Sequence, residues 1–331
     1  MLSPSSHSYS LASPPPSEPP QCQRRRLPPT GTLLITLLVL CIASTNAQNL
    51  FVSNLYTETV WEFDPGGSLI TSTLGSGLGQ PQGLAFDLRG NLYLAYYDYT
   101  TRLSSVAQFG PSGNLLNSSF ISGLRYATGL AFDSAGNLYV ADRSSTRIAK
   151  YGPTGDLINP AFASASYPTL FGSWGMAFDR DDNLYVADSV NNTVVKITPT
   201  GSMNASFITG LGYPTGLTFD RSDNLYVANY YTGVISEYDT SGNIINASFA
   251  STGAGYNVES LAFGPSGNLY VGNNGNGRVM EFGPEGNLIN ASFASGGAGA
   301  EFIAFSVPEP STWALLSLGV ASLLALRRRN V

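Results

Sequence analysis

A short motif, Asn-Leu-Tyr or Asn-Leu-Phe, recurs six times along the chain, at intervals of 42, 46, 46, 41 and 44 residues. The six copies begin at Asn49, Asn91, Asn137, Asn183, Asn224 and Asn268. Repeats of about 40 to 50 residues that consist of short strands are typical of β-propellers, in which each repeat forms one four-stranded blade. The repeat therefore predicts an all-β fold, a six-bladed propeller with four-stranded antiparallel blades.

Turn residues divide each repeat into two hairpins. In the third repeat, residues 133–136 (Asp-Ser-Ala-Gly) separate two apolar strands, and Asp, Ser and Gly favour a tight reversal. Five turns of this first kind follow Phe86, Phe132, Phe178, Phe219 and Phe263. A second kind, such as Gly-Pro-Ser-Gly at residues 110–113, occurs six times. The first repeat therefore lacks its first strand.

The missing strand is found at the far end of the repeats. Residues 302–305 (Phe-Ile-Ala-Phe) match the other first strands, and Phe305 lies 18 residues after Asn287, as Phe132 lies 18 residues after Asn114. We expect this segment to complete the first blade and close the ring. Because closure removes exposed sheet edges, the propeller is expected to be a monomer.

The N-terminal residues carry the features of an export signal. Three arginines at residues 24–26 precede an apolar run at 33–43, and Ala47 ends a stretch of small residues. This order is typical of a secretory signal peptide cleaved after Ala47; the alternative is a short membrane anchor. The sequence thus predicts a disordered extension and signal peptide at 1–47, a propeller at 48–305 and a third segment at 306–331.

The C-terminal segment has three parts: a Pro-Glu-Pro stretch, an apolar run and an arginine cluster. Residues 312–326 number 15, which spans roughly 22 Å as a helix, against a hydrocarbon core of about 30 Å. This order resembles the PEP-CTERM sorting signal of Gram-negative bacteria. The residues that carry the resemblance are Pro308, Glu309, Pro310, Arg327, Arg328 and Arg329.

The resemblance implies a sorting enzyme of the exosortase type, which cleaves near the Pro-Glu-Pro stretch. It implies an exported protein, held briefly in the inner membrane by a short C-terminal transmembrane helix. The protein would then reach the cell envelope, the outer surface or the extracellular matrix, where polysaccharide or envelope proteins are the expected partners. The alternative for this tail is a simple C-terminal anchor.

Composition excludes several functions. Cys22, Cys41 and His7 all precede residue 48, so the predicted propeller has no thiol and no imidazole. Cysteine or histidine nucleophiles, Ser-His-Asp triads and histidine-ligated zinc are therefore excluded there. Residues 48–307 hold ten Lys and Arg against twenty Asp and Glu, and this acidity argues against nucleic-acid binding.

The repeat unit resembles the NHL repeat. It consists of Gly-Leu-Ala-Phe-Asp, then Gly-Asn-Leu-Tyr-Val-Ala-Asp, then a third strand such as residues 146–151, and the resemblance covers residues 49–305. It implies the propeller fold. It does not choose a function, because propellers of this kind include protein-binding, RNA-binding and enzymatic members.

Loops on one face of such a propeller carry aromatic residues among Asn, Asp and Glu, and Gln82, Arg143 and Glu301 fall on the same face. Aromatic rings with polar neighbours suit sugar rings or an extended peptide. We therefore predict a non-catalytic binding or scaffold module for a glycan or protein ligand. The alternative is that the tyrosines pack between blades and the acids cap turns. The predicted ligand-binding residues are Tyr97, Tyr126, Trp174, Tyr213, Tyr230, Tyr231 and Tyr256.

An enzymatic hypothesis stays open. Gluconolactonase and senescence-marker propellers hold a divalent metal in the central channel, and oxygen ligands alone can bind Ca²⁺. The candidates in this chain are Glu259, Asp142, Asp188 and Asn229. This alternative is a Ca²⁺-dependent lactonase-like or other hydrolase or lyase propeller. The antibiotic lyases of similar fold use a histidine base, which residues 48–307 lack, and the preferred hypothesis has no catalytic residue and no cofactor.

Overall fold

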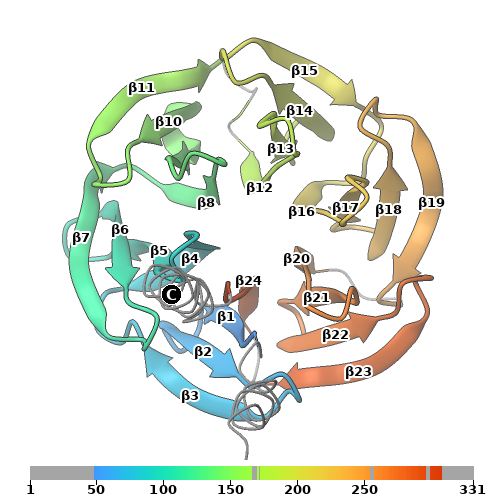
Figure 1. The fold of residues 1–331 in the computed structure, drawn as a ribbon, viewed down its shortest axis with the longest axis horizontal. Coiled ribbons are helices and arrows are strands. Elements are labelled where there is room, and N and C mark those ends of the chain that lie inside the picture. The colour runs from blue at the N-terminus through green and yellow to red at the C-terminus, as the bar shows by residue number, and fades with distance from the viewer. Residues whose placement is uncertain (1–47, 166–169, 171, 254–256, 296–298, 308–331) are drawn as a thin grey trace, which may run out of the picture. The chain divides into compact units, whose positions relative to one another are not determined.

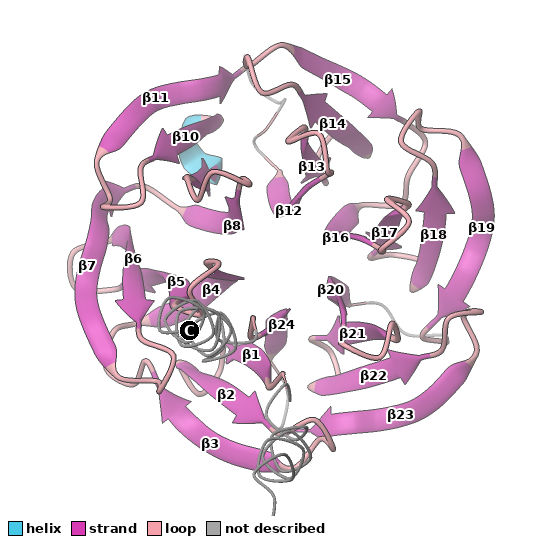
Figure 2. Ribbon diagram, viewed as in Figure 1, coloured by secondary structure: helices cyan, strands magenta, loops and turns pink. Residues whose placement is uncertain are grey.

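A computed structural model describes residues 48–165, 170, 172–253, 257–295 and 299–307. These residues form six four-stranded antiparallel sheets arranged as blades around a central opening, which confirms the predicted fold (Figure 1). Apart from one 3-10 turn at Arg143–Ser145, the regular structure of the described residues is strand (Figure 2). None of the described segments is a helix long and apolar enough to cross a membrane. The predicted signal peptide with Ala47, and the tail from Pro308 onward, lie outside the described residues.

The four strands of each blade run from the channel to the rim. From innermost to outermost, blade 1 contains β24 (Ala300–Phe305), β1 (Leu50–Asn54), β2 (Thr59–Phe63) and β3 (Leu69–Leu74). In the same order, blade 2 contains β4 (Gln80–Phe86), β5 (Leu92–Asp98), β6 (Leu103–Phe109) and β7 (Leu115–Leu124). Blade 3 contains β8 (Ala127–Phe132), β9 (Leu138–Asp142), β10 (Arg147–Tyr151) and β11 (Leu157–Ser164). Blade 4 contains β12 (Ser173–Phe178), β13 (Leu184–Asp188), β14 (Thr193–Ile197) and β15 (Met203–Ile208). Blade 5 contains β16 (Pro214–Phe219), β17 (Leu225–Asn229), β18 (Val234–Tyr238) and β19 (Ile244–Ser251). Blade 6 contains β20 (Val258–Phe263), β21 (Leu269–Asn273), β22 (Arg278–Phe282) and β23 (Leu288–Ser295).

The ring closes in blade 1, where the last described strand pairs with the first. In β24, Phe305 is opposite Leu50 of β1, so the expected closing strand is confirmed and begins two residues earlier, at Ala300. The next residue also takes part: the Ser306 amide donates to the Asn49 carbonyl at 2.9 Å, and Gln48 Nε2 donates to the Ser306 carbonyl at 2.7 Å. Both ends of the described chain are thus joined through residue 306.

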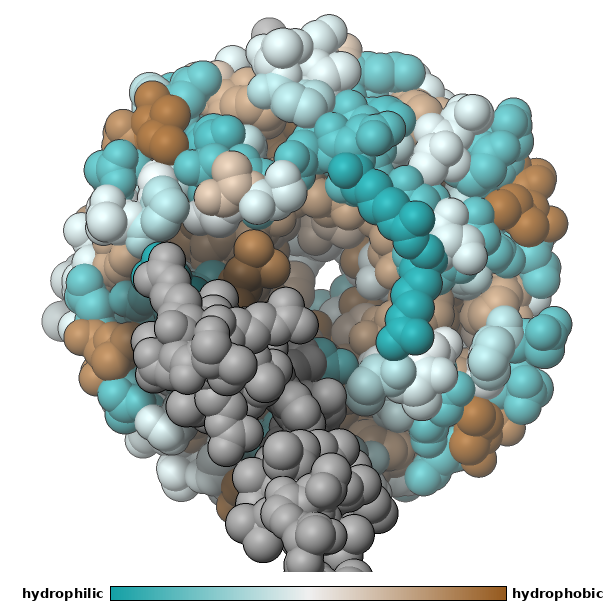
Figure 3. Space-filling view, viewed as in Figure 1, coloured by the Kyte–Doolittle hydropathy of each residue, from teal (hydrophilic) through white to brown (hydrophobic). Residues whose placement is uncertain are grey.

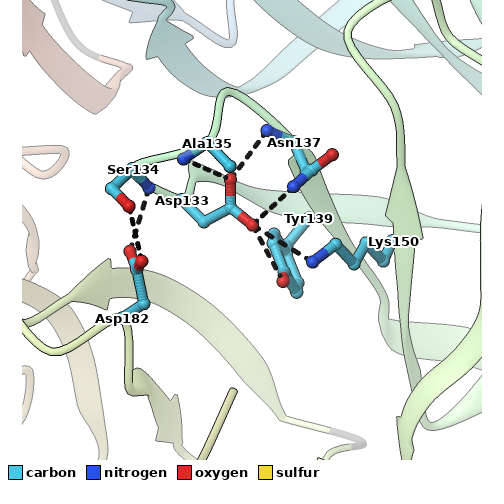
Figure 4. A network of polar contacts seen from close by, with 7 residues as sticks. All are labelled: Asp133, Ser134, Ala135, Asn137, Tyr139, Lys150 and Asp182. Atoms are coloured by element: carbon cyan, nitrogen blue, oxygen red, sulfur yellow. Dashed lines mark hydrogen bonds and ion pairs between the residues drawn. The ribbon is translucent and has the colours of Figure 1, made fainter. Parts of the chain in front are cut away.

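The hairpin turn between the first and second strands explains why the Asn-Leu-Tyr motif recurs. In blade 3, Asp133 accepts hydrogen bonds from the Asn137 amide at 2.8 Å, the Asn137 side chain at 2.8 Å and the Tyr139 hydroxyl at 3.2 Å (Figure 4). Lys150 from β10 adds an ion pair at 3.1 Å. Burial raises the pKa of Asp133, but the bonds from Asn137 and Lys150 outweigh it and lower that pKa below its usual value. The motif therefore supplies the donors for one carboxylate.

In other blades, a different acidic residue accepts the hydrogen bonds from the Asn and Tyr of the motif. In blade 6 the turn has no aspartate, and Glu281 on β22 accepts from both Asn268 and Tyr270 at 2.8 Å. In blade 1, Glu62 accepts from Asn49 at 2.6 Å. The motif Asn donates to an acid in these blades, and so does the motif Tyr in blades 3 and 6, whereas the position of the acid changes and blade 1 has Phe51 in place of the Tyr.

Aromatic side chains fill the junctions between neighbouring blades, which we call seams. In five seams the motif tyrosine lies between the phenylalanine of its own outermost strand and the phenylalanine of the next blade's innermost strand, with ring centroids 4.8 to 5.4 Å apart. The outer-strand residues are Phe120, Phe162, Phe207, Phe249 and Phe293. Edge-to-face rings of this kind add stability beyond their buried area, by about 1 kcal/mol per pair.

The two faces of the ring have different loops. The hairpin turns after Phe86 and its equivalents, the Pro-Ser-Gly turns, Gln48 and Val307 lie on one face, which we call the turn face. The loops between blades and those after each second strand lie on the other, which we call the mouth face. The outermost strands carry exposed aliphatic pairs, and separated brown patches lie over β7, β11, β19 and β23 (Figure 3).

Candidate functional site at the mouth of the channel

One position of the repeat distinguishes the blades near the channel. This position directly precedes the Gly-Leu-Ala-Phe sequence or its equivalent in the innermost strand. It is the third residue of that strand in blade 2 and the second in the other blades. The six residues are Gln82, Thr128, Trp174, Thr215, Glu259 and Glu301. The two threonines are structural, because each hydroxyl donates to a backbone carbonyl of the next blade at 2.7 Å. The other four side chains give the channel its chemistry.

Three of these four side chains present oxygen acceptors from neighbouring blades. Gln82 Oε1, Glu259 Oε2 and Glu301 Oε2 are buried and have no hydrogen-bond partner among the described residues. They belong to blades 2, 6 and 1, which are consecutive around the ring. We call these three residues the acceptor arc. A buried polar atom without a partner costs about 1 to 3 kcal/mol, so the arc suits a bound ligand or ordered water.

The two carboxyl groups of the arc are held close to their neutral form. Burial raises the pKa of Glu259 to about 7, although a hydrogen bond from Asn274 at 3.1 Å and the charge of Arg143 act in the opposite direction. Burial, and then the charge of Glu259, raise the pKa of Glu301 well above its usual value. At neutral pH the pair can therefore donate as well as accept hydrogen bonds.

A tryptophan lies across the channel from the acceptor arc. The Arg143 guanidinium carbon is 4.8 Å from the Trp174 ring centroid, and the Phe302 ring is stacked at 6.4 Å. The indole Nε1 is buried without a partner among the described residues. Trp174, Glu259 and Phe302 line a cavity of about 60 Å³, which can hold a few waters but no sugar ring. A ligand must therefore lie at the mouth.

The predicted tyrosines form two clusters on the mouth face. Tyr97 and Tyr126 have ring centroids 5.7 Å apart. Tyr213, Tyr230 and Tyr231 form the second cluster, with centroids 5.1 to 5.7 Å apart. The predicted Tyr256 lies outside the described residues.

Each tyrosine cluster lies near one carboxyl group of the acceptor arc. Burial raises the pKa of Tyr126, and the charge of Glu301 adds to that increase. Burial likewise raises the pKa of Tyr230, with the charge of Glu259 adding to it. The arrangement places aromatic rings on two sides of a group of buried oxygens.

Three of the four residues considered as metal ligands bind backbone instead. Asp142 accepts from the Arg125 and Tyr126 amides at 3.1 and 3.0 Å. Asp188 accepts from the Leu170 amide at 2.9 Å, and Asn229 from the Gly212 amide at 3.0 Å. Each thereby fixes the loop that enters its own blade. Within the described ranges there is no group of three or more His, Cys, Asp or Glu side chains that could hold a metal ion, so this donor set does not fit Ca²⁺.

Glu259 and Trp174 are candidate site residues on sequence alone, whereas the sequence assigned no role to Gln82, Arg143 and Glu301. Alignment of the six innermost strands is sufficient to find Gln82 and Glu301, because they replace the structural threonine of blades 3 and 5. Arg143 gives no such signal. Its contact with Trp174 depends on how the loop of blade 3 lies against blade 4.

Residues 306–329 match the PEP-CTERM protein-sorting motif. The motif implies export and processing by an exosortase, and it covers the segment that was predicted to carry the sorting signal. Only Ser306 and Val307 of the match belong to the described residues. No curated protein sequence matches the chain.

Solved structures resemble the propeller at low sequence identity. A chain of the nidogen/laminin complex is 16% identical, with a TM-score of 0.63, over 79% of this chain and 99% of its own. An inactive form of virginiamycin B lyase from Staphylococcus aureus with quinupristin is 14% identical, with a TM-score of 0.57, over 81% and 94%. A putative gluconolactonase is 14% identical, with a TM-score of 0.56, over 71% and 88%. At such identities the similarity shows the fold alone.

Proposed function

We propose that the exported propeller is a non-catalytic module that binds a glycan at the mouth of its central channel. The observation that carries this proposal is that the acceptor arc of Gln82, Glu259 and Glu301 and the indole donor of Trp174 all have buried polar atoms without a partner among the described residues. A ligand with several hydroxyl groups at fixed positions can pair with acceptors and donor together. Sugars have this property, and their apolar faces also stack on aromatic rings.

The surroundings of the arc favour a neutral ligand. Burial raises the pKa values of Glu259 and Glu301 and so reduces their charge at neutral pH, and Arg143 lies near both. A strongly acidic or basic ligand would therefore gain little from charge. The two tyrosine clusters, which are partly exposed on either side, provide the flat contacts that sugar rings use.

The sorting motif supports a place for this activity outside the cytoplasm. Export followed by exosortase processing would bring the propeller to the outer surface or to the extracellular matrix, where polysaccharides are abundant. A binding module there would attach the protein to the matrix or crosslink it to envelope proteins. A glycan is therefore favoured over a protein ligand as the primary partner.

The test is a glycan array with the mature protein and three variants. Glu301→Gln changes hydrogen bonding with little change in shape, and Trp174→Phe removes the indole donor together with part of the ring. Each should reduce binding about tenfold or more. Leu88→Ala removes a side chain that is 66% exposed on the turn face, so it should bind as the unaltered protein does. Absence of any glycan ligand, or binding that is the same in all variants, would reject the proposal.

A second candidate function is catalysis, favoured by one observation. A carboxyl group with a pKa of about 7 is well suited to general acid and base chemistry near neutral pH, and Glu259 has this property. Lactone hydrolysis measured with and without added Ca²⁺ tests it. Activity that is abolished by Glu259→Gln would support catalysis, and activity that requires Ca²⁺ would restore the metal hypothesis.

A further inference from the structure

The seam between blades 1 and 2 lacks the phenylalanine that fills the other five. Between β10 and β11, Lys150 is opposite Asn159 and Ile148 is opposite Ala163, so four positions separate the two partners on the outer strand. Between β2 and β3, Glu62 is opposite Thr71 and Val60 is opposite Leu74, only three positions later. Between these two paired positions, the outermost strand of blade 1 is therefore one residue shorter, and the missing residue is the phenylalanine.

The missing side chain leaves an open cavity at this seam. In blade 3, a Cβ added to Gly155 would lie 3.2 Å from the Phe120 ring, which packs over that turn. In blade 2 the equivalent glycine, Gly113, has only the Leu74 side chain near it, at 3.3 Å. A cavity of about 400 Å³ lies at this seam, and we call it the seam slot. Its lining includes Glu62, Thr71, Thr73, Leu78, Phe109 and Ser112.

The five filled seams indicate what fits the seam slot. Each holds an aromatic ring between an outer strand and a glycine of the next blade's second turn. The seam slot has the apolar walls for a ring in Leu74, Leu78 and Phe109. It also has oxygen atoms in Glu62, Thr71 and Thr73 that could accept a hydrogen bond. An indole, with one donor on an apolar ring, matches this lining better than a phenyl ring does.

The described chain ends beside the seam slot. The Val307 carbonyl oxygen lies 3.6 Å from a Cβ placed on Gly90, and that Cβ position lies 3.7 Å from Pro111. Pro111 directly precedes Ser112 and Gly113, which line the slot. The segment after Val307 therefore starts within a few residues of this cavity.

That segment contains one aromatic residue, Trp313, six positions after Val307. Six extended residues span up to about 20 Å, which is sufficient to reach the slot from the last described residue. Pro308 and Pro310 have no amide hydrogen that could donate to a neighbouring strand. We propose that the seam slot binds the indole of Trp313, so that the sorting segment docks on the propeller that it follows.

Docking of this kind has a consequence for processing. Residues 307–312, which include the Pro-Glu-Pro stretch, would then connect Ser306, which is bonded to the ring, with Trp313 in the slot. An enzyme that acts near the Pro-Glu-Pro stretch would have to displace the indole first.

The test uses disulfide trapping in the full chain, with Cys22 and Cys41 replaced by serine. Ser112→Cys and Thr312→Cys should form a disulfide at least about fivefold more often than Thr154→Cys with Thr312→Cys. Thr154 occupies the equivalent turn position of blade 3, next to a filled seam. Trp313→Phe should retain much of the trapping, and Trp313→Ala should reduce it about fivefold.

A second variant fills the slot from within the propeller. Insertion of a phenylalanine after Thr73 restores the length of the other outer strands and should reduce trapping as much as Trp313→Ala does. Circular dichroism would confirm that the variant with the inserted phenylalanine is folded. If it is not folded, the result with Trp313→Ala decides the proposal. Trapping that is unchanged by Trp313→Ala, or equal at Ser112 and Thr154, would overturn the proposal.

Discussion

The two faces of the propeller use polar side chains in opposite ways. On the turn face, Asp133 is paired with four different donor residues, and the same kind of network recurs from blade to blade with Asp or Glu as the acceptor. On the mouth face, Glu259 and Glu301 each keep one buried oxygen without a partner among the described residues. Repetition of side chains therefore maintains the fold, whereas departure from repetition marks the candidate site.

The largest expected effect comes from breaking the turn-face network. Asp133→Ala leaves the Asn137 amide and side chain, the Tyr139 hydroxyl and Lys150 without their common acceptor. Loss of a buried charged acceptor costs about 3 kcal/mol of unfolding free energy, measurable by urea denaturation. Asp156→Ala is the control, because Asp156 is exposed, and it should cost less than about 0.5 kcal/mol. Equal losses in the two variants would contradict the network's role.

Removal of a buried carboxylate on the mouth face should raise the unfolding free energy, whereas its removal on the turn face should lower it. The pKa of Glu259 is raised from 4.5 to about 7, so its contribution to stability is complete below pH 4.5 and is lost as the pH rises through 7. Above that range the charged carboxylate costs about 3 kcal/mol. Glu259→Gln should therefore stabilise the protein at pH 8 by about 2 to 3 kcal/mol and make its stability less dependent on pH. Glu285→Gln, at an exposed turn, should change neither the stability at pH 8 nor its dependence on pH. If Glu259→Gln destabilises the protein instead, the Glu259 carboxylate is paired.

Asn229 lies on the mouth face but bonds to backbone groups, so its removal should lower the unfolding free energy, as removal of a turn-face acid does. Asn229 accepts from the Gly212 amide at 3.0 Å and donates to the Val234 carbonyl at 3.2 Å. Asn229→Ala should cost about 1 to 2 kcal/mol of unfolding free energy in thermal or urea denaturation, with glycan binding unchanged in the folded protein. Asn276→Ala, at an exposed position, should cost less than about 0.5 kcal/mol. Loss of binding without loss of stability would return Asn229 to the site.

The smallest effect on stability is expected in the tyrosine clusters. Tyr231 is 55% exposed, so Tyr231→Ala should change the unfolding free energy by less than about 0.5 kcal/mol. The same change removes a stacking surface worth about 1 kcal/mol, so glycan binding measured by calorimetry should weaken about fivefold to tenfold. Tyr56→Ala serves as the control, since Tyr56 is 70% exposed on the same face but belongs to neither cluster. Equal binding by both variants would remove the second cluster from the site.

Much of the fold could be predicted because local signals repeat. The Asn-Leu-Tyr spacing indicated the number of blades, and the turns indicated the order of the strands. The match of residues 302–305 to the other first strands located the closure, although Ser306 also bonds Asn49. The site was less predictable, since Asp142 and Asp188 were candidates alongside Glu259 but bond to loop amides.

The sequence by itself determined the repeat, the ring closed by its two ends, the sorting motif and the absence of histidine and cysteine from residues 48–307. These follow from local spacing and composition, which need no knowledge of contacts between blades. Only the tertiary structure decided which acids remain without partners, that Arg143 covers Trp174, and that the seam between blades 1 and 2 is open. The physical reason is that burial and hydrogen-bond pairing depend on neighbours from other blades that are distant along the chain, as the bond from Thr128 to the Ser173 carbonyl, 45 residues away, illustrates.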